Sequence, residues 1–243
     1  MPNGKPTDLD YARRRFNAAM EKYNNKKRYR WFGTVVATAN VSLQLVLLWM
    51  LKDVALSLPG EAAAVVAAWI FTDFLNGLVH LYMDANDGYD SLAGPLIANF
   101  HLHHKTPVYT PRCLPVVYFV ETGSKVWLAG YLSAVALLAV FDLVSPWLLH
   151  VLVFTGVLSS VAEVSHYLCH TSSSPVAKVL GESRILLSKR HHAAHHLEDN
   201  VSYAFLNGLT DPWINVLAAK VSPGYKHHTD LHYADYETTG DSR

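Results

Sequence analysis

Long apolar runs separated by short polar segments occupy most of the chain. Apolar residues dominate positions 31–51, 62–83, 126–144 and 147–165. Each run holds about 20 residues, the length at which an α-helix crosses the roughly 30 Å hydrocarbon core of a bilayer. The pattern therefore predicts an all-α integral membrane protein built as a four-transmembrane-helix bundle.

The segments outside these runs divide the chain into three parts. Residues 1–30 form a polar N-terminal segment, which is either a helix lying at the membrane surface or a solvated tail. Residues 31–220 form one membrane domain, in which 171–220 follow the last span as a helical cap. Residues 221–243 form a polar tail, whose three histidines we expect to be exposed.

Four spans place both chain ends on one side of the membrane. The basic run at 26–30 and the Lys- and Arg-bearing last third of the chain predict that this side is cytoplasmic, by the positive-inside rule. The same topology puts the histidine-rich segments on the cytoplasmic side, whereas His150 falls at the opposite end of the fourth span. We expect a multi-pass protein of a bacterial inner membrane or the endoplasmic reticulum, with both termini and its polar cap in the cytoplasm.

Composition supports the membrane prediction and excludes other classes. The chain is 51% hydrophobic and 16% charged, whereas about a quarter of the residues in an ordinary soluble domain are charged. Its formal net charge of zero gives no electrostatic case for binding nucleic acid. Cys113 and Cys169 are the only cysteines, and they form neither a CxxC pair nor a disulfide scaffold.

Histidine is unusually frequent, and most of the histidines lie in one part of the sequence. Of 14 histidines, 11 lie between His80 and His196. The densest stretch is 189–196, KRHHAAHH, in which His192, His195 and His196 would share one helical face. Neutral imidazole is a common ligand for iron, zinc, copper and nickel. The stretch lacks the Glu of the H-E-x-x-H zinc protease motif, so a protease helix is excluded.

Further polar residues follow helical spacing near the ends of two predicted spans. They are Asp73, Asn76, His80 and Asp84 in the second span, and Glu163, His166 and His170 at the end of the fourth. Ionisable groups at membrane depth usually mark a functional interior. Both stripes therefore point to a site at one end of the bundle.

The compact clusters contain more imidazoles than one metal ion requires. The predicted metal ligands are His80, Asp84, His103, His104, His166, His170, His192, His195 and His196. A structural zinc takes four ligands and a catalytic zinc three, so this set predicts two metal ions with open positions. Two metals held mainly by neutral nitrogen favour oxygen activation by non-haem iron over hydrolysis by zinc.

Several neighbouring residues have roles that the pattern leaves open. His101 and His191 are additional ligands or only flank the clusters, and Asp84 is a ligand, an orienting partner of His80 or a helix cap. The remaining polar residues of the two spans are Asp73, Asn76 and Glu163. Asp73 and Glu163 are either orienting partners of metal ligands or partners of other buried polar groups. The Asn76 side chain binds either a lipid headgroup or neighbouring helices.

The order and spacing of these motifs resemble one family of membrane enzymes. The motifs are His80-x-x-x-Asp84, Phe100-x-x-His103-His104, His166-x-x-x-His170, His192-x-x-His195-His196 and the segment 203–208. They resemble the membrane lipid-desaturase family, which includes the plasmanylethanolamine desaturases that form plasmalogens and a plant phosphatidylglycerol fatty acid desaturase. The resemblance implies a di-iron enzyme that uses O2 and external electrons to introduce a double bond into the alkyl or acyl chain of an intact phospholipid.

The chain carries no haem or flavin motif, so electrons must come from a separate carrier. A basic docking patch for an acidic carrier such as cytochrome b5 or ferredoxin is predicted near the histidine stretch, formed by Lys178, Arg184, Lys189 and Arg190.

Two alternative functions stay open. One is a lipid or sterol hydroxylase of the same histidine-rich class, and the other is a metal transporter, whose ligands would lie near the bilayer midplane.

Overall fold

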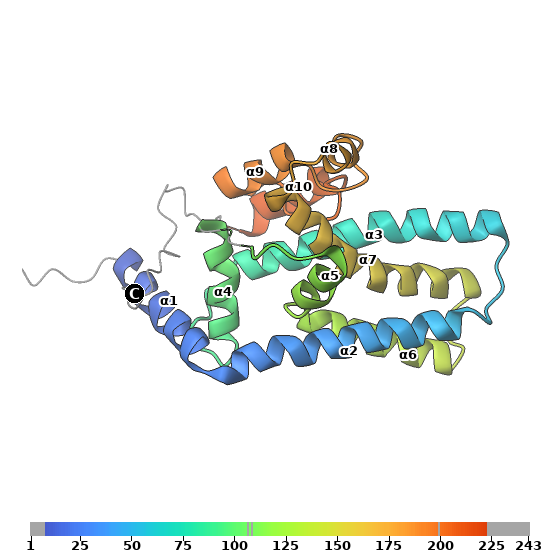
Figure 1. Ribbon diagram of the computed structural model, residues 1–243, viewed down its shortest axis with the longest axis horizontal. Coiled ribbons are helices and arrows are strands. Elements are labelled where there is room, and N and C mark those ends of the chain that lie inside the picture. Colours follow the sequence, from blue (N-terminus) through green and yellow to red (C-terminus); the bar gives the residue numbers. More distant parts are fainter. Residues whose placement is uncertain (1–7, 106, 108, 199, 223–243) are drawn as a thin grey trace, which may run out of the picture.

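The computed structural model describes residues 8–105, 107, 109–198 and 200–222, and this part of the chain folds into α-helices joined by loops. Their bounds are α1 Asp8–Asn25, α2 Lys27–Leu51, α3 Leu58–Asp84, α4 Gly94–Lys105, α5 Leu114–Thr122, α6 Val126–Val140, α7 Pro146–Thr171, α8 Pro175–Glu182, α9 Lys189–Leu197 and α10 Asp211–Val221. Figure 1 shows α2, α3, α6 and α7 side by side, with α8, α9 and α10 gathered along one side of α3. The prediction of an all-α fold is confirmed; most of the predicted tail, including its three histidines, lies outside the described residues.

Three helices, α2, α3 and α7, are long and apolar enough to cross a membrane, with 25, 27 and 26 residues. A possible fourth span consists of α5 and α6, which meet at an angle of 89°. The predicted third span, 126–144, is therefore wrong in its extent, because α6 ends at Val140 and its 15 residues reach only about 22 Å. Asp142 ends it with a positive φ of 51°, and Leu143 donates to the carbonyl of Leu138, a closure typical of helix C-termini.

Serine followed by proline starts several helices where the sequence turns back into the bundle. Ser57 precedes α3, Ser145 precedes α7 and Ser174 precedes α8, and each hydroxyl accepts a hydrogen bond from an amide of the first turn. The next one or two residues include a proline, which lacks an amide hydrogen and fits the start of a helix. The helix α7 is longer than the predicted fourth span, 147–165, because it continues without a break to Thr171.

The helices α3 and α7 pack closely and run in the same direction (Figure 1). Small polar residues lie between them: Thr72 and Asn76 on α3, and Thr155 and Ser159 on α7, all fully buried. Such residues allow close approach of helices in a membrane and link them by hydrogen bonds, here from the Asn76 amide to the Ser159 hydroxyl at 3.0 Å. The C-terminal ends of α3 and α7 consequently lie together.

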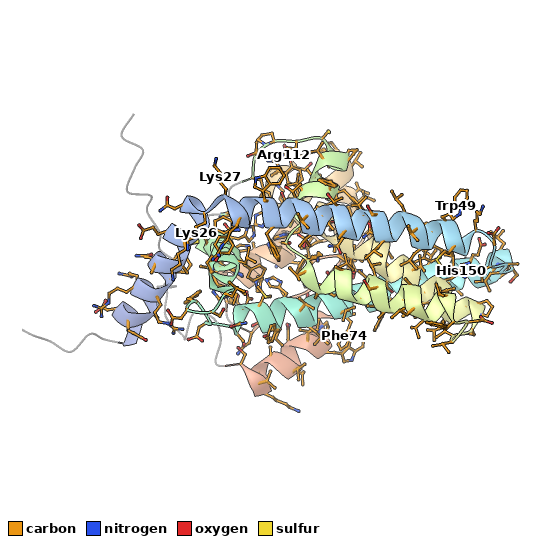
Figure 2. All side chains as sticks on the ribbon, turned by 90° about the horizontal axis from the view of Figure 1, so that it is seen from below. Lys26, Lys27, Trp49, Phe74, Arg112 and His150 are labelled. Atoms are coloured by element: carbon orange, nitrogen blue, oxygen red, sulfur yellow. The ribbon has the colours of Figure 1, made fainter. Side chains whose placement is uncertain are left out.

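The opposite end of the bundle is formed by the end of α2 and the start of α7. Trp49 and His150 lie there, far from Lys26 and Lys27 (Figure 2). His150 is buried in the first turns of α7, and its Nδ1–H donates to the Pro146 carbonyl at 2.8 Å. This histidine is a helix-end residue, as predicted.

The N-terminal segment is helical and packs against the rest of the protein. Phe16, Ala19 and Met20 of α1 are buried against Tyr89 and the apolar side of α4. Arg15 also pairs with Asp90 and Asp87 beyond the end of α3. Residues 8–25 are therefore not a solvated tail, and α2 begins before the predicted start of the first span.

The corner between α5 and α6 gives a test of this packing. A Cβ on Gly123 would lie 2.4 Å from the Gly33 carbonyl oxygen of α2, which is backbone and cannot rotate away. We expect Gly123→Ala to separate α2 from this corner and to lower the free energy of unfolding by about 1–3 kcal/mol. The matched control is Gly130→Ala, because no atom lies within 4 Å of its added Cβ. Equal melting temperatures of the two variants in detergent would contradict this packing.

Candidate metal centre

Nine side chains from four helices converge in two adjacent groups near the ends of α3 and α7. The first group contains His103, His166, His170, His192 and His196, and the second contains His80, Asp84, His104 and His195. Within each group the potential ligand atoms lie within 4.8 Å of one another. The structure thus brings together all nine residues that the sequence predicts as ligands.

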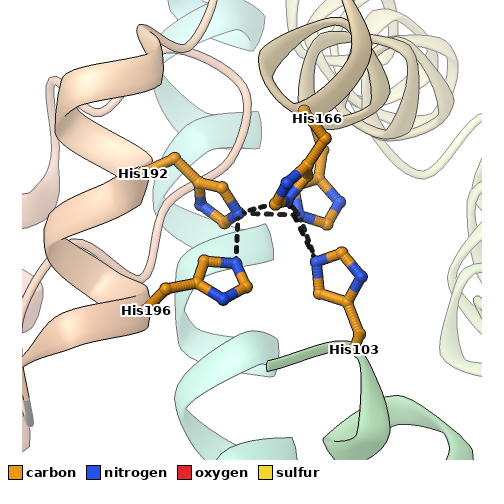
Figure 3. Close-up of side chains that lie close together, drawn as sticks. His103, His166, His192 and His196 are labelled. Carbon is orange, nitrogen blue, oxygen red and sulfur yellow. Dashed lines mark hydrogen bonds between the residues drawn. The ribbon is translucent and has the colours of Figure 1, made fainter. Parts of the chain in front are cut away.

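The first group is made entirely of imidazoles whose Nε2 atoms point at one another. His192 Nε2 lies 2.9 Å from His166 Nε2 and 2.8 Å from His170 Nε2. His103 approaches from α4 and His196 from the next turn of α9 (Figure 3). A hydrogen atom can bridge only one pair of nitrogens, whereas a cation between them would satisfy several. The donor set of this group fits a metal ion.

The second group places one buried carboxylate among three imidazoles. His104 Nε2 lies 2.9 Å from Asp84 Oδ1, and the Nε2 atoms of His80 and His195 lie 3.5 Å and 3.4 Å from Oδ2. All four residues have almost no exposed side-chain surface. A buried carboxylate needs a compensating positive charge. A metal ion bound by the three nitrogens would supply it, so this group also fits a metal.

Helical spacing explains how neighbouring residues reach different groups. Successive residues on a helix project about 100° apart. On α4, His103 therefore faces the first group and His104 faces the second. On α9, His196 faces the first group and His195 faces the second. The helices α4 and α9 each link the two groups, so the groups are adjacent and their relative position is fixed.

Burial keeps the imidazoles of His103, His192 and His196 neutral. Desolvation is the largest cause, and it lowers the pKa of His103 and of His192 well below the usual value and that of His196 to about 3. Nearby imidazoles lower these pKa values further. A neutral imidazole has the free lone pair that a metal requires, so these residues are prepared for binding at neutral pH.

Backbone carbonyls orient several of the rings. His80 Nδ1 lies 2.7 Å from the Tyr203 carbonyl, and His195 Nδ1 lies 2.9 Å from the Val201 carbonyl. A carbonyl oxygen only accepts, so Nδ1 must carry the hydrogen and Nε2 is left as the ligand atom. Such contacts fix the tautomer and the direction of a metal-binding imidazole.

Asp73 holds the loop that provides these carbonyls. Its two oxygens accept hydrogen bonds from the amides of Asn207, Gly208 and Thr210 and from the Thr210 hydroxyl, at 2.7–3.1 Å. These partners belong to the loop and not to a histidine. Of the roles left open for Asp73, the structure therefore favours that of a partner of buried polar groups.

Glu163 and Asn76 share a buried partner that sequence reasoning missed. Lys125, only 4% exposed, lies 2.9 Å from Glu163 Oε1 and donates to Asn76 Oδ1. The other oxygen of Glu163 lies 3.9 Å from His166 Nδ1. Asn76 thus binds neighbouring helices, and Glu163 compensates a buried cation beside the first group. The sequence signal was weak, because Lys125 directly precedes an apolar run and resembles an ordinary flanking charge.

His101 and His191 lie outside both groups in the described part of the chain. His101 bridges the Tyr89 hydroxyl and the Met83 carbonyl, at 2.6 Å and 2.8 Å, and so connects α4 to the end of α3. His191 contacts Asp211 at the start of α10. Both ring nitrogens of His101 and the Nε2 of His191 are engaged outside the two groups, which favours the role of flanking residues for both histidines.

A cavity of about 810 Å³ adjoins the metal-binding groups. His80, His103 and His166 line one part of it, and residues of α2 and α5 line another. Tyr109 also lines the cavity and lies 3.1 Å from His166 Nδ1 through its hydroxyl. Sequence reasoning missed Tyr109, since a single tyrosine in a proline-containing loop carries no helical spacing.

The four basic residues predicted to bind an electron carrier are exposed. Lys189 and Arg190 begin α9, the helix that carries three of the ligands. Lys178 lies on α8 and is 3.8 Å from Glu182. Arg184 follows α8 with a positive φ of 56°.

The fold and the site define a helical membrane-type protein with two imidazole-rich metal-binding groups at one end of its long apolar helices. A family model described as a lipid desaturase domain matches residues 69–221, which is more than half of the 243-residue chain. The chain belongs to this family of lipid desaturases, which are oxidoreductases. No curated protein and no solved structure matches the chain.

The buried ion pair beside the first group gives a second test. We expect Lys125→Met to lower the free energy of unfolding by about 3–5 kcal/mol, because the Glu163 carboxylate would remain buried without a cation. The double variant Lys125→Met/Glu163→Gln should recover most of this loss, since it removes both charges. Thermal unfolding in detergent measures both effects. A double variant that is no more stable than Lys125→Met would show that the two charges are not coupled.

Proposed function

We propose that the protein is a di-iron, O2-dependent membrane lipid desaturase that introduces a double bond into the alkyl or acyl chain of an intact phospholipid, of the plasmanylethanolamine or the phosphatidylglycerol type. The proposal rests on one observation above all. Two adjacent ligand groups, linked by His103–His104 and His195–His196, form part of the wall of a single cavity. Membership of the lipid desaturase family supports the reaction class.

The donors of both groups suit iron, zinc, copper or nickel, and membership of the lipid desaturase family favours iron among these metals. Their donors are imidazole nitrogens with one carboxylate, and thiolates are absent from both. Iron ions held there would supply oxygen activation and the removal of hydrogen from an unactivated carbon, chemistry that side chains alone do not perform. The task of the chain is then to hold the ligands and to position one segment of a lipid chain beside them.

The wall of the cavity has features that suit a lipid chain. Phe100 and Phe205 pack edge-on against His80, with ring centroids at 5.4 Å and 4.9 Å, and all three line the cavity. These rings exclude water from the side of the second group that faces the cavity. Arg112 is exposed and lines the same cavity, so a cation is available to a lipid phosphate.

The reaction is tested with the purified, iron-loaded protein in vesicles of defined phospholipids, with O2 and a reduced electron carrier. A desaturase yields a lipid that has lost two hydrogens from one chain and consumes O2. A product that has gained one oxygen instead would favour the lipid hydroxylase. Transport of a metal ion across the vesicle without a lipid product would favour the transporter, although both ligand groups lie at one end of the helices.

The position of the lipid chain gives a third prediction. Thr34 is exposed on α2 and lines the cavity, whereas Thr38, one turn further on, is exposed but does not. Thr34→Trp should lower kcat/KM for the lipid by about tenfold, equivalent to about 1.4 kcal/mol. Thr38→Trp is the matched control and should retain activity. Equal activity of the two variants, with equal iron content, would place the substrate elsewhere.

Electron delivery gives a fourth prediction. Lys189 and Arg190 are exposed at the start of α9, beside the ligands, and we propose that they bind an acidic carrier such as cytochrome b5 or ferredoxin. Lys189→Glu/Arg190→Glu should slow turnover and change its dependence on salt, because the attraction that steers the carrier becomes a repulsion that added salt screens. A small chemical reductant in place of the carrier should restore the rate. Unchanged kinetics at all salt concentrations would exclude this patch.

A further inference from the structure

The helical cap contacts α3 well inside the length of that helix. Trp69 Nε1 donates to the Ile185 carbonyl at 3.2 Å. One turn further along, Asp73 binds the amides of the 207–210 loop. After another turn, Gly77 leaves room for α10, because a Cβ there would lie 2.4 Å from a side chain of that helix. The three positions follow one stripe of α3, so the cap lies alongside the helix, as Figure 1 also shows.

These contacts fall at membrane depth wherever α3 is placed in the bilayer. The helix has 27 residues, from 58 to 84, and about 20 residues are needed to cross the hydrocarbon core. A crossing stretch within α3 must begin between residues 58 and 65, and every such stretch includes residues 65–77. Trp69, Asp73 and Gly77 therefore lie within the hydrocarbon layer, and so do the cap segments that touch them.

Exposed apolar side chains gather on the outer surface of the cap at the same level, and the exposed Lys220 shares their face of α10, from which its long side chain can reach water. Side chains that are 38–68% exposed include Val176 and Val179 on α8, Ile185 in the following turn, and Trp213, Val216, Leu217 and Val221 on α10. The α10 residues have the spacing of one helical face. The opposite face of α10, with Ile214 and Ala218, packs against Leu81 of α3. The exposed face continues the apolar surface of α3 outward.

Several backbone amides in the loops of the cap donate to buried or partly buried side chains of the protein. Their acceptors are side chains of α3, α7 and α10: Asn215 for Ser202, Asp211 for Ala204, Asp73 for Asn207, Gly208 and Thr210, and Ser165 for Leu187. Non-helical backbone is tolerated at membrane depth only where protein groups replace water as its partners. This observation is independent of the exposed apolar surface and points to the same environment.

We propose that α8, the 183–187 turn and α10 are embedded in the bilayer leaflet that faces the metal centre, with their outer faces in contact with lipid acyl chains. The partner of this surface is thus the membrane itself. Trp213 would lie near the headgroup level, a position that tryptophan favours. Lys178 and Arg184 lie within these segments, and their long side chains would extend to the lipid headgroups. Only Lys189 and Arg190 then remain for a carrier protein.

Site-specific labels test this placement in the full chain, reconstituted in vesicles of phosphatidylcholine. Cysteine is introduced singly at Val179 or Val216 in a Cys113→Ser background, because Cys113 is exposed and Cys169 is buried, and an environment-sensitive fluorophore is attached. Val66→Cys, on the exposed surface of α3, is the lipid-facing control, and Arg190→Cys is the water-facing control. Unchanged elution volume and iron content verify the fold of each labelled variant.

The labels at Val179 and Val216 should lose fluorescence to a phospholipid with a nitroxide on its acyl chain nearly as much as the label at Val66. They should lose little to aqueous iodide, which should quench the label at Arg190. Quenching of either label by iodide, as at Arg190, would overturn the proposal. Protection from both quenchers would overturn it too, since a second protein chain would then cover this surface. The readout does not depend on desaturation, so it stands apart from the proposed activity.

Discussion

The metal centre depends on the close, parallel packing of α3 against α7. Both helices run toward the same end, and each carries ligands in its last turns: His80 and Asp84 on α3, His166 and His170 on α7. The electrostatic potential at a helix C-terminus is negative, which favours a cation there. Antiparallel packing of the same two helices would place their ligands at opposite faces of the membrane. The small buried residues between the helices thus fix the position of the site.

The ligands could be predicted because the pattern that identifies them lies within short stretches of the sequence. Spacings of three and four residues place side chains on one helical face, and the pairs His103–His104 and His195–His196 follow a recognisable family pattern. The number of histidines also indicated two metals before their positions were known. The two-group arrangement of all nine residues agrees with that reasoning.

Other features depend on contacts between distant parts of the chain, so the sequence alone either missed them or left their role open. Lys125 resembles a flanking charge, yet it is buried beside Glu163. Asp73 resembles a carboxylate of the site, yet it binds a loop more than 130 residues away. The bend between α5 and α6 falls at residues 123–125, which the sequence pattern indicates only as a polar segment before the third span, whereas in the structure α5 and α6 form a bent pair. In each case a tertiary contact, and not local spacing, determines the role.

The most direct test of this account is the iron content of the purified protein. We predict two irons per chain in the wild type, with a marked loss in His170→Ala, which removes a ligand of the first group, and in His80→Ala, which removes one of the second. His101→Ala should keep its iron, because His101 bridges Tyr89 and Met83 outside both groups. A single metal ion per chain, or loss of metal in only one of the two ligand variants, would contradict the two-group centre.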